Sequence, residues 1–114
     1  MKQFQKSVIQ YKMDASGKQI LENGEPVKIK DIGVFTFQSP KMSEVEEILL
    51  TISAKMARAG GLVGDRTFNM LEAMTWLPKV VVEPKGWNVD SVESEQELIA
   101  IYFAFQADHG ALKN

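Results

Sequence analysis

The first residue to consider for catalysis or metal binding is His109, the only histidine in the chain. A catalytic base needs a nucleophile beside it, and a metal ion needs further ligands. The chain offers no second histidine and no cysteine to complete either site. His109 directly precedes Gly110, and a cation suits the C-terminal end of a helix. We therefore interpret His109 as an exposed or capping residue and predict that the His109→Ala variant keeps its activity.

The glycine-rich segment 60–65, Gly-Gly-Leu-Val-Gly-Asp, is superficially similar to a phosphate-binding loop. It lacks the lysine and the serine or threonine of a P-loop, and it would follow a helix rather than a strand. Two adjacent glycines are instead typical of the end of a helix. We interpret the segment as a helix stop followed by an interhelix loop.

Two groups of acidic residues could suggest a metal site. Glu44, Glu46 and Glu47 are clustered, and Asp90 and Glu93 lie in a polar turn. Both groups stand where a helix is expected to begin, where acids cap backbone N–H groups and oppose the helix dipole. The sequence therefore predicts no metal, no cofactor and no catalytic residue, and the protein is not expected to be an enzyme.

The methionines and tryptophans leave two interpretations open. Met56, Met70 and Met74 would fill a core, although flexible thioethers also suit adaptable binding surfaces. Trp76 and Trp87 belong to a residue type that is enriched both in cores and at interfaces. Trp87 is expected to cover the apolar stripe of the last helix, with an interface role as the alternative.

Composition limits the class of protein. A chain of 114 residues with 45% hydrophobic content fits a single globular domain, 1–114. Its net charge of −2 comes from mixed acids and bases, which argues against a nucleic-acid binder. Absence of cysteine excludes disulfides and thiolate sites. No stretch approaches the ~20 apolar residues of a membrane span, and the N-terminus has no signal-peptide pattern. The expected location is the cytoplasm of a host cell, or a particle assembled there.

The N-terminal part, 1–38, has the pattern of a small antiparallel sheet. Segment 3–13 favours a strand, and Asn23-Gly24 is a strong hairpin signal. Val27 and Ile29 alternate with lysines, and 34–37 is again β-prone. Such a small sheet needs helices on its apolar face to be stable.

The remainder, 39–114, is predicted to be helical, with helices over 43–59, 66–77 and 94–109. Two Ser-x-x-Glu capping boxes, an aspartate N-cap and apolar stripes at helical spacing support them. Gly60-Gly61, Pro78 and Gly110 are expected to end them in turn. Residues 80–82 are expected to form either a short strand or an extended link. The fold class is therefore α+β, with a short N-terminal hairpin or small sheet followed by a three-helix bundle.

The helix over 66–77 carries apolar residues on two sides, and a small domain buries one of them more readily than both. The surplus side, together with the last helix, would form an exposed patch, and such patches usually mark interaction sites. A partner helix or a second copy of the chain would bind there. The residues predicted to take part are Met70, Ala73, Met74, Trp76, Trp87 and Tyr102.

Several short sequence motifs resemble those of one known family. Segment 35–40, Phe-Thr-Phe-Gln-Ser-Pro, precedes the helical part, and segment 84–87, Pro-Lys-Gly-Trp, precedes the last helix. This arrangement over about 34–109 is similar to tail assembly chaperones of tailed bacteriophages. Gln38 stands where a basic residue is common in that family, and 1–33 lies outside the likeness. The residues that carry it are Phe35, Phe37, Pro40, Pro84, Gly86, Trp87, Leu98 and Tyr102.

The resemblance implies a non-enzymatic function. A tail assembly chaperone binds the tape-measure protein, keeps it soluble, and recruits tail-tube subunits until the tube polymerises around it. An alternative is a structural component of the virion, in the tail or at the head–tail junction. A third class, a small inhibitor of host proteins, fits the size but has no positive signal.

Overall fold

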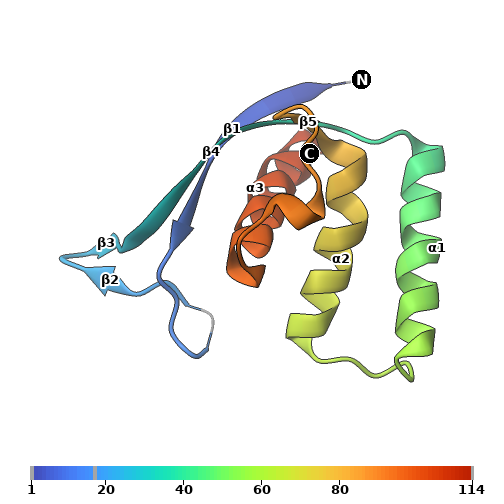
Figure 1. Cartoon of the computed structure of the whole chain (residues 1–114), viewed down its shortest axis with the longest axis horizontal. Coiled ribbons are helices and arrows are strands. Elements are labelled where there is room, and N and C mark those ends of the chain that lie inside the picture. The colour runs from blue at the N-terminus through green and yellow to red at the C-terminus, as the bar shows by residue number, and fades with distance from the viewer. Residues whose placement is uncertain (1, 17, 114) are drawn as a thin grey trace.

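The computed structural model describes residues 2–16 and 18–113, with side chains described as far as Ala107. Its main sheet has three antiparallel strands in the order β1 (Gln3–Tyr11), β4 (Lys28–Gln38) and β5 (Val81–Glu83). A two-stranded hairpin, β2 (Leu21–Glu22) and β3 (Glu25–Pro26), lies at the far end of the β1–β4 ribbon. The expected mixture of N-terminal antiparallel strands and three helices is confirmed, with β5 as an additional strand after the second helix (Figure 1).

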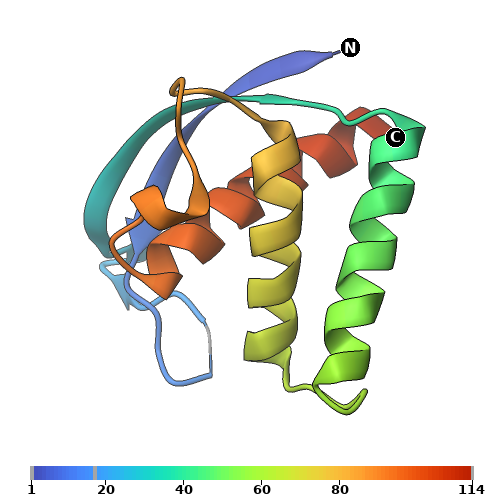
Figure 2. The ribbon, with the colours of Figure 1, turned by 45° about the vertical axis from the view of Figure 1, so that its right-hand side comes forward.

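The outer part of the β1–β4 ribbon, residues 9–16 and 18–31, forms a projecting β-arm. The pairing register shifts between Val8 and Ile9, opposite Gly33, whose positive φ of 124° fits a β-bulge. At the tip, Asn23 and Gly24 both have positive φ, as the predicted tight hairpin turn requires. The bulge bends the ribbon, so the arm leaves the helices while residues 3–8 stay packed on them (Figures 1 and 2).

Three helices complete the fold: α1 (Met42–Arg58), α2 (Asp65–Val80) and α3 (Glu95–Lys113), with a short 3₁₀ turn, η1 (Val89–Ser91), before α3. The predicted helices match these within a few residues. At the start of α1, Lys41 N–H donates to Glu44 Oε1 at 2.9 Å, so Glu44 rather than Glu46 closes the cap.

Two expected helix ends are incorrect. Pro78 does not end α2, which continues to Val80. Proline removes only one backbone donor, and the extra turn buries Val80 completely in the core. Gly110 does not end α3, which continues to Lys113. Glycine weakens a helix by only ~1 kcal/mol, so it need not stop one.

The helices form a stack rather than a closed bundle. α3 packs on β1 and on α2, and α1 packs chiefly on the opposite side of α2 (Figures 1 and 2). α1 is therefore the outermost layer at one end of the molecule, and the β-arm projects at the other end (Figure 1).

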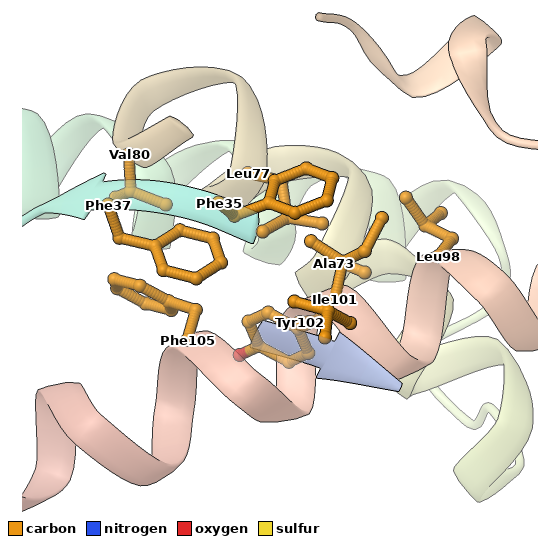
Figure 3. Packing of buried hydrophobic residues seen from close by; sticks show 10 residues of the cluster. Phe35, Phe37, Ala73, Leu77, Val80, Leu98, Ile101, Tyr102 and Phe105 are labelled. Atoms are coloured by element: carbon orange, nitrogen blue, oxygen red, sulfur yellow. The ribbon is translucent and has the colours of Figure 1, made fainter. Parts of the chain in front are cut away.

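The core lies where the sheet, α2 and α3 meet (Figure 3). The ring of Phe37 from β4 meets the ring of Phe105 from α3 edge-on, with centroids 5.6 Å apart. The Phe4 ring stacks on Phe105, and the Trp76 ring meets Phe105 at a tilt. The buried members of this cluster are Val8, Phe35, Phe37, Ala73, Leu77, Val80, Leu98, Ile101, Tyr102 and Phe105.

Candidate partner-binding site

The six residues predicted to bind a partner do not form one exposed surface. Ala73 and Tyr102 are buried in the core, so neither can meet a partner in this structure. Met70 and Trp76 are partly buried and pack against the same core, and Met74 alone of the four α2 residues is largely exposed. The predicted surface is corrected accordingly, because most of it faces inward.

Trp87 is also partly buried, and its main aromatic contact is with the sheet. Its ring meets Phe35 of β4 edge-on, with centroids 5.9 Å apart and an interplanar angle of 82°. Trp87 therefore covers the sheet end of the core. Five of the residues that carry the family resemblance, namely Phe35, Phe37, Trp87, Leu98 and Tyr102, belong to or pack on this one cluster. The resemblance thus concerns the core and its cover rather than an exposed contact surface.

α1 explains why α2 has no surplus apolar side. Phe68 and Leu71, on the side of α2 away from the core, are partly buried. Lys55 of α1 reaches the Thr75 hydroxyl of α2 at 3.5 Å. Since α1 covers this second side of α2, the unpartnered apolar surface must lie elsewhere.

The hydroxyl of Tyr102 forms hydrogen bonds that link α3 to α2. Its hydroxyl donates to Glu72 Oε2 at 3.2 Å and accepts from Gln106 Nε2 at 3.0 Å. Burial, with the nearby Glu72 charge as a smaller cause, raises the pKa of the Tyr102 phenol well above its ordinary value. The phenol is therefore held protonated in a hydrogen-bonded link between α2 and α3.

A second polar cluster fastens the start of α3 to the sheet. The carboxylate of Glu97 is nearly buried and accepts from Glu93 N–H at 3.2 Å and from Lys30 Nζ at 3.3 Å. Lys30 of β4 also donates to Glu93 Oε2 at 2.9 Å. The hydrogen bond with Glu93, followed by that with Glu97, raises the pKa of Lys30. Glu93 thus pairs with a distant strand, which its interpretation as a local capping acid did not foresee.

A groove of about 1180 Å³ lies under the β-arm. One wall is β1 with the turn that follows it, and the other is α3 with the first turns of α2. On α3 the lining residues recur at helical spacing and form one stripe: Gln96, Ile99, Ala100, Phe103 and Ala104. We refer to this hollow as the arm groove.

The arm groove is mainly apolar inside and charged at its rims. Phe103 of α3 is 44% exposed, and Met13 and Ile29 of the β-arm are similarly accessible. Charged side chains of both signs surround these residues. At one rim, Arg66 Nε donates to Glu95 Oε2 at 2.9 Å and joins α2 to α3. Such a surface suits an amphipathic segment rather than a charged or a small polar ligand.

A smaller hollow of about 220 Å³ lies between α2, η1 and the start of α3. Met70 and Met74 line it with Val89, Val92 and Leu98. Met70 also lines the arm groove, so it is the predicted site residue that both hollows share.

The sequence contained one signal for the arm groove. Ile99 and Phe103 widen the apolar stripe of the last helix beyond the width that a single neighbour covers. The wall formed by β1 could not be foreseen, because hydrophobic alternation along a strand does not show how far the strand bends from a helix.

No arrangement for catalysis is seen among the described residues. Within that part of the chain, no three acidic or histidine side chains come together to hold a metal ion. The side chain of His109 lies outside the described residues. Over the same described part, no helix has both the length and the hydrophobicity to cross a bilayer.

No family model matches the chain, and no match was found among curated proteins or solved structures.

Proposed function

We propose that this protein acts by binding another protein, and that it is a tail assembly chaperone of a tailed bacteriophage. The observation that carries the proposal is the arm groove, a long and mainly apolar hollow with accessible Phe103, Met13 and Ile29. The short sequence motifs around Phe35 and Trp87, which resemble this family, support the proposal independently.

The groove favours a helical segment as its occupant. A cylinder ~10 Å wide with a rise of ~1.5 Å per residue encloses a volume near that of the groove in ~10 residues, about three helical turns. Ala100 and Ala104 lie one turn apart on the α3 stripe, so a helix could approach α3 closely there. The mixed charges at the rims would meet the polar side of an amphipathic helix.

This chemistry suits a chaperone for the tape-measure protein. A long amphipathic helix exposes a continuous apolar stripe until its final partners assemble around it. Covering three turns of that stripe at a time, many copies of a small protein would keep the helix soluble. The tail-tube subunits would then replace them as the tube polymerises.

The test is co-expression with the tape-measure protein of the same phage, followed by measurement of their binding. The Phe103→Asp variant places a charge on the α3 wall of the groove. We expect it to bind the tape-measure protein at least tenfold more weakly, because binding would desolvate the new carboxylate. Leu21→Asp is the matched control, since Leu21 is an exposed apolar residue at the tip of the β-arm, outside the groove. Circular dichroism of both variants would show that the fold is intact.

Two outcomes would contradict the proposal. Absence of binding to the tape-measure protein would reject the chaperone function. The presence of the protein in finished particles, at a copy number set by ring symmetry, would favour the alternative of a structural virion component.

A further inference from the structure

The side of α1 that faces away from α2 carries several exposed apolar side chains, with exposed Glu46 among them and exposed Glu47 and Arg58 at its margin. The exposed residues that form this side at helical spacing are Met42, Ser43, Glu46, Leu49, Leu50, Ser53, Ala54 and Ala57. Met42 is 80% exposed, Leu50 64% and Leu49 55%, and Leu62, just beyond the helix, is 92% exposed. A helix normally turns charged and polar residues toward water, and contiguous apolar patches usually mark interaction sites. We refer to these eight residues as the outer face of α1.

We propose that two copies of this protein associate through the outer face of α1, with the two helices packed antiparallel about a twofold axis that crosses this face midway between Leu50 and Ser53. This inference is independent of the arm groove and of its occupant. It identifies a second copy as the partner of a surface that the fold leaves uncovered.

Charge along α1 selects the antiparallel arrangement. Three of the five charged side chains of α1 contact their own chain: Glu44 accepts from Lys41 N–H, Glu47 pairs with Lys79, and Lys55 reaches Thr75. Glu46 toward the N-terminal end and Arg58 at the C-terminal end are exposed. An antiparallel pair places Glu46 of each helix beside Arg58 of the other, whereas a parallel pair places like charges together. Glu46 lies on the outer face itself and Arg58 at its end, so the twofold axis would form this pair twice.

The sizes of the side chains fit the same axis. With the axis midway between Leu50 and Ser53, Leu50 of one copy lies across from Ser53 of the other, and Leu49 lies across from Ala54. Large side chains over small ones let two helices approach to ~8–10 Å, the usual distance between packed helices. Met42 of each copy would lie near the opposite helix end, where Leu62 is exposed. The most exposed apolar residues at both ends would therefore be covered together.

A twofold interface of this kind is closed, because the same surface is used by both copies. The outer face of α1 and the β-arm lie at opposite ends of the molecule (Figure 1). The dimer would consequently leave both arm grooves open, at its two far ends.

We expect weak association. A helix of 17 residues is ~25 Å long, and one face of it offers less than the ~800 Å² per partner of a standard stable interface. A dissociation constant on the order of 10–100 µM is expected for such a small apolar contact. Sedimentation velocity of the full chain from ~5 to ~500 µM covers this range, and the mass should rise toward twice that of one chain.

The first variant is Leu50→Glu, which places a carboxylate at the centre of the contact. We expect at least tenfold weaker association with an unchanged circular dichroism spectrum, because Leu50 is exposed in the single chain. Leu21→Glu makes the same change at an exposed leucine on the β-arm and should associate like the wild type. Equal association of both variants and the wild type would overturn the proposal.

A charge exchange tests the direction of the helices. Glu46→Arg alone and Arg58→Glu alone should each weaken association about fivefold, because like charges then meet across the axis. The double variant should return to within about twofold of the wild type. Twelve residues, ~18 Å of helix, separate the two positions, so the recovery cannot come from a pair within one chain.

Failure of the double variant to recover would overturn the antiparallel arrangement. A wild-type chain that stays monomeric at every concentration would overturn the dimer itself, and a different protein would then be the partner of this face.

Discussion

The two sides of α2 are stabilised in different ways. The inner side meets α3 and the sheet through a continuous aromatic and aliphatic cluster centred on Phe37 and Phe105. The outer side meets α1 alone, and only Ile48 and Ile52 of α1 are buried there. A helix that packs on a single neighbour leaves its opposite face exposed to water. The α1 side of the fold is therefore the side with exposed apolar residues on a helix.

This difference bears on function. The inner cluster positions the floor of the arm groove, since buried Tyr102 and Phe105 fix the orientation of α3 while Phe103 between them points outward. The outer layer contributes nothing to that groove. The two proposed interaction surfaces therefore differ in origin: one results from the bend of the β-arm, and the other from the incomplete covering of α1.

The largest effect should come from the inner cluster. Phe37→Ala removes a fully buried ring that contacts Phe4, Phe35 and Phe105. We expect a loss of about 3–5 kcal/mol in the free energy of unfolding, measured by urea denaturation. Phe103→Ala, two residues before the buried Phe105 but exposed to the groove, should cost less than about 1 kcal/mol. Similar losses in the two variants would show that the core is not centred on Phe37.

A smaller effect is expected in the outer layer. Ile48→Ala should cost about 2–3 kcal/mol, at the low end for a buried isoleucine, because α1 can shift to fill part of the cavity. Its neighbour Leu49 is exposed, and Leu49→Ala should change stability by less than about 0.5 kcal/mol. In the Ile48→Ala variant, amide hydrogen exchange should accelerate in α1 while α3 keeps its protection. Equal acceleration in both helices would mean that α1 does not open separately.

The positions of the elements could be predicted from the sequence because their signals are local. Asn23-Gly24 forms the turn of a hairpin, and the helices begin and end near their predicted bounds, Pro78 and Gly110 apart. Each such signal depends on backbone conformation or on caps within a few residues. The prediction that Pro78 ends the second helix was wrong, because it considered only the local effect of proline. Burial of Val80 in the core, a tertiary effect, continues α2 past Pro78.

The surfaces were harder to predict because hydrophobic spacing does not identify the neighbour. Leu49 directly follows the buried Ile48 in the apolar sequence of the first helix, but it is exposed, because only one side of that helix is packed. Ala73 and Tyr102 were predicted to bind a partner, but α3 and the sheet already cover them. The sequence predicted an exposed apolar surface on the second helix. In the structure, the exposed apolar residues lie instead on α1 and in the arm groove.

Polar contacts at the border of the core provide a finer comparison. Glu97→Gln removes the charge that accepts from Lys30 Nζ and Glu93 N–H. We expect a loss of about 1–2 kcal/mol, because the Glu97 carboxylate is nearly buried and its hydrogen bonds are charge-assisted. Glu95→Gln, which alters a much more exposed pair with Arg66, should have little effect. If urea denaturation gave equal losses for both, burial would not be what makes the Glu97 contacts effective.

The smallest effect at neutral pH is expected for Tyr102→Phe, which keeps the buried ring and removes its hydroxyl. The links to Glu72 and Gln106 are lost, at a cost of about 1 kcal/mol. Burial raises the pKa of the Tyr102 phenol in the folded protein above its ordinary value of 10. Stability from the protonated phenol is therefore fully present below pH 10 and is lost as the pH rises, by about 1.4 kcal/mol per pH unit.

The Tyr102→Phe variant should lack this alkaline loss, so its disadvantage should shrink between pH 8 and pH 11 in urea denaturation. Tyr11→Phe, which changes the other tyrosine and leaves Tyr102 in place, should keep the wild-type pH dependence. Both variants keep every lysine, so comparing the two removes the contribution of these residues. If the difference in the free energy of unfolding between wild type and Tyr102→Phe were constant at all pH values, water would reach the phenol. The inner side of α2 would then be less tightly closed at this border than at Phe37.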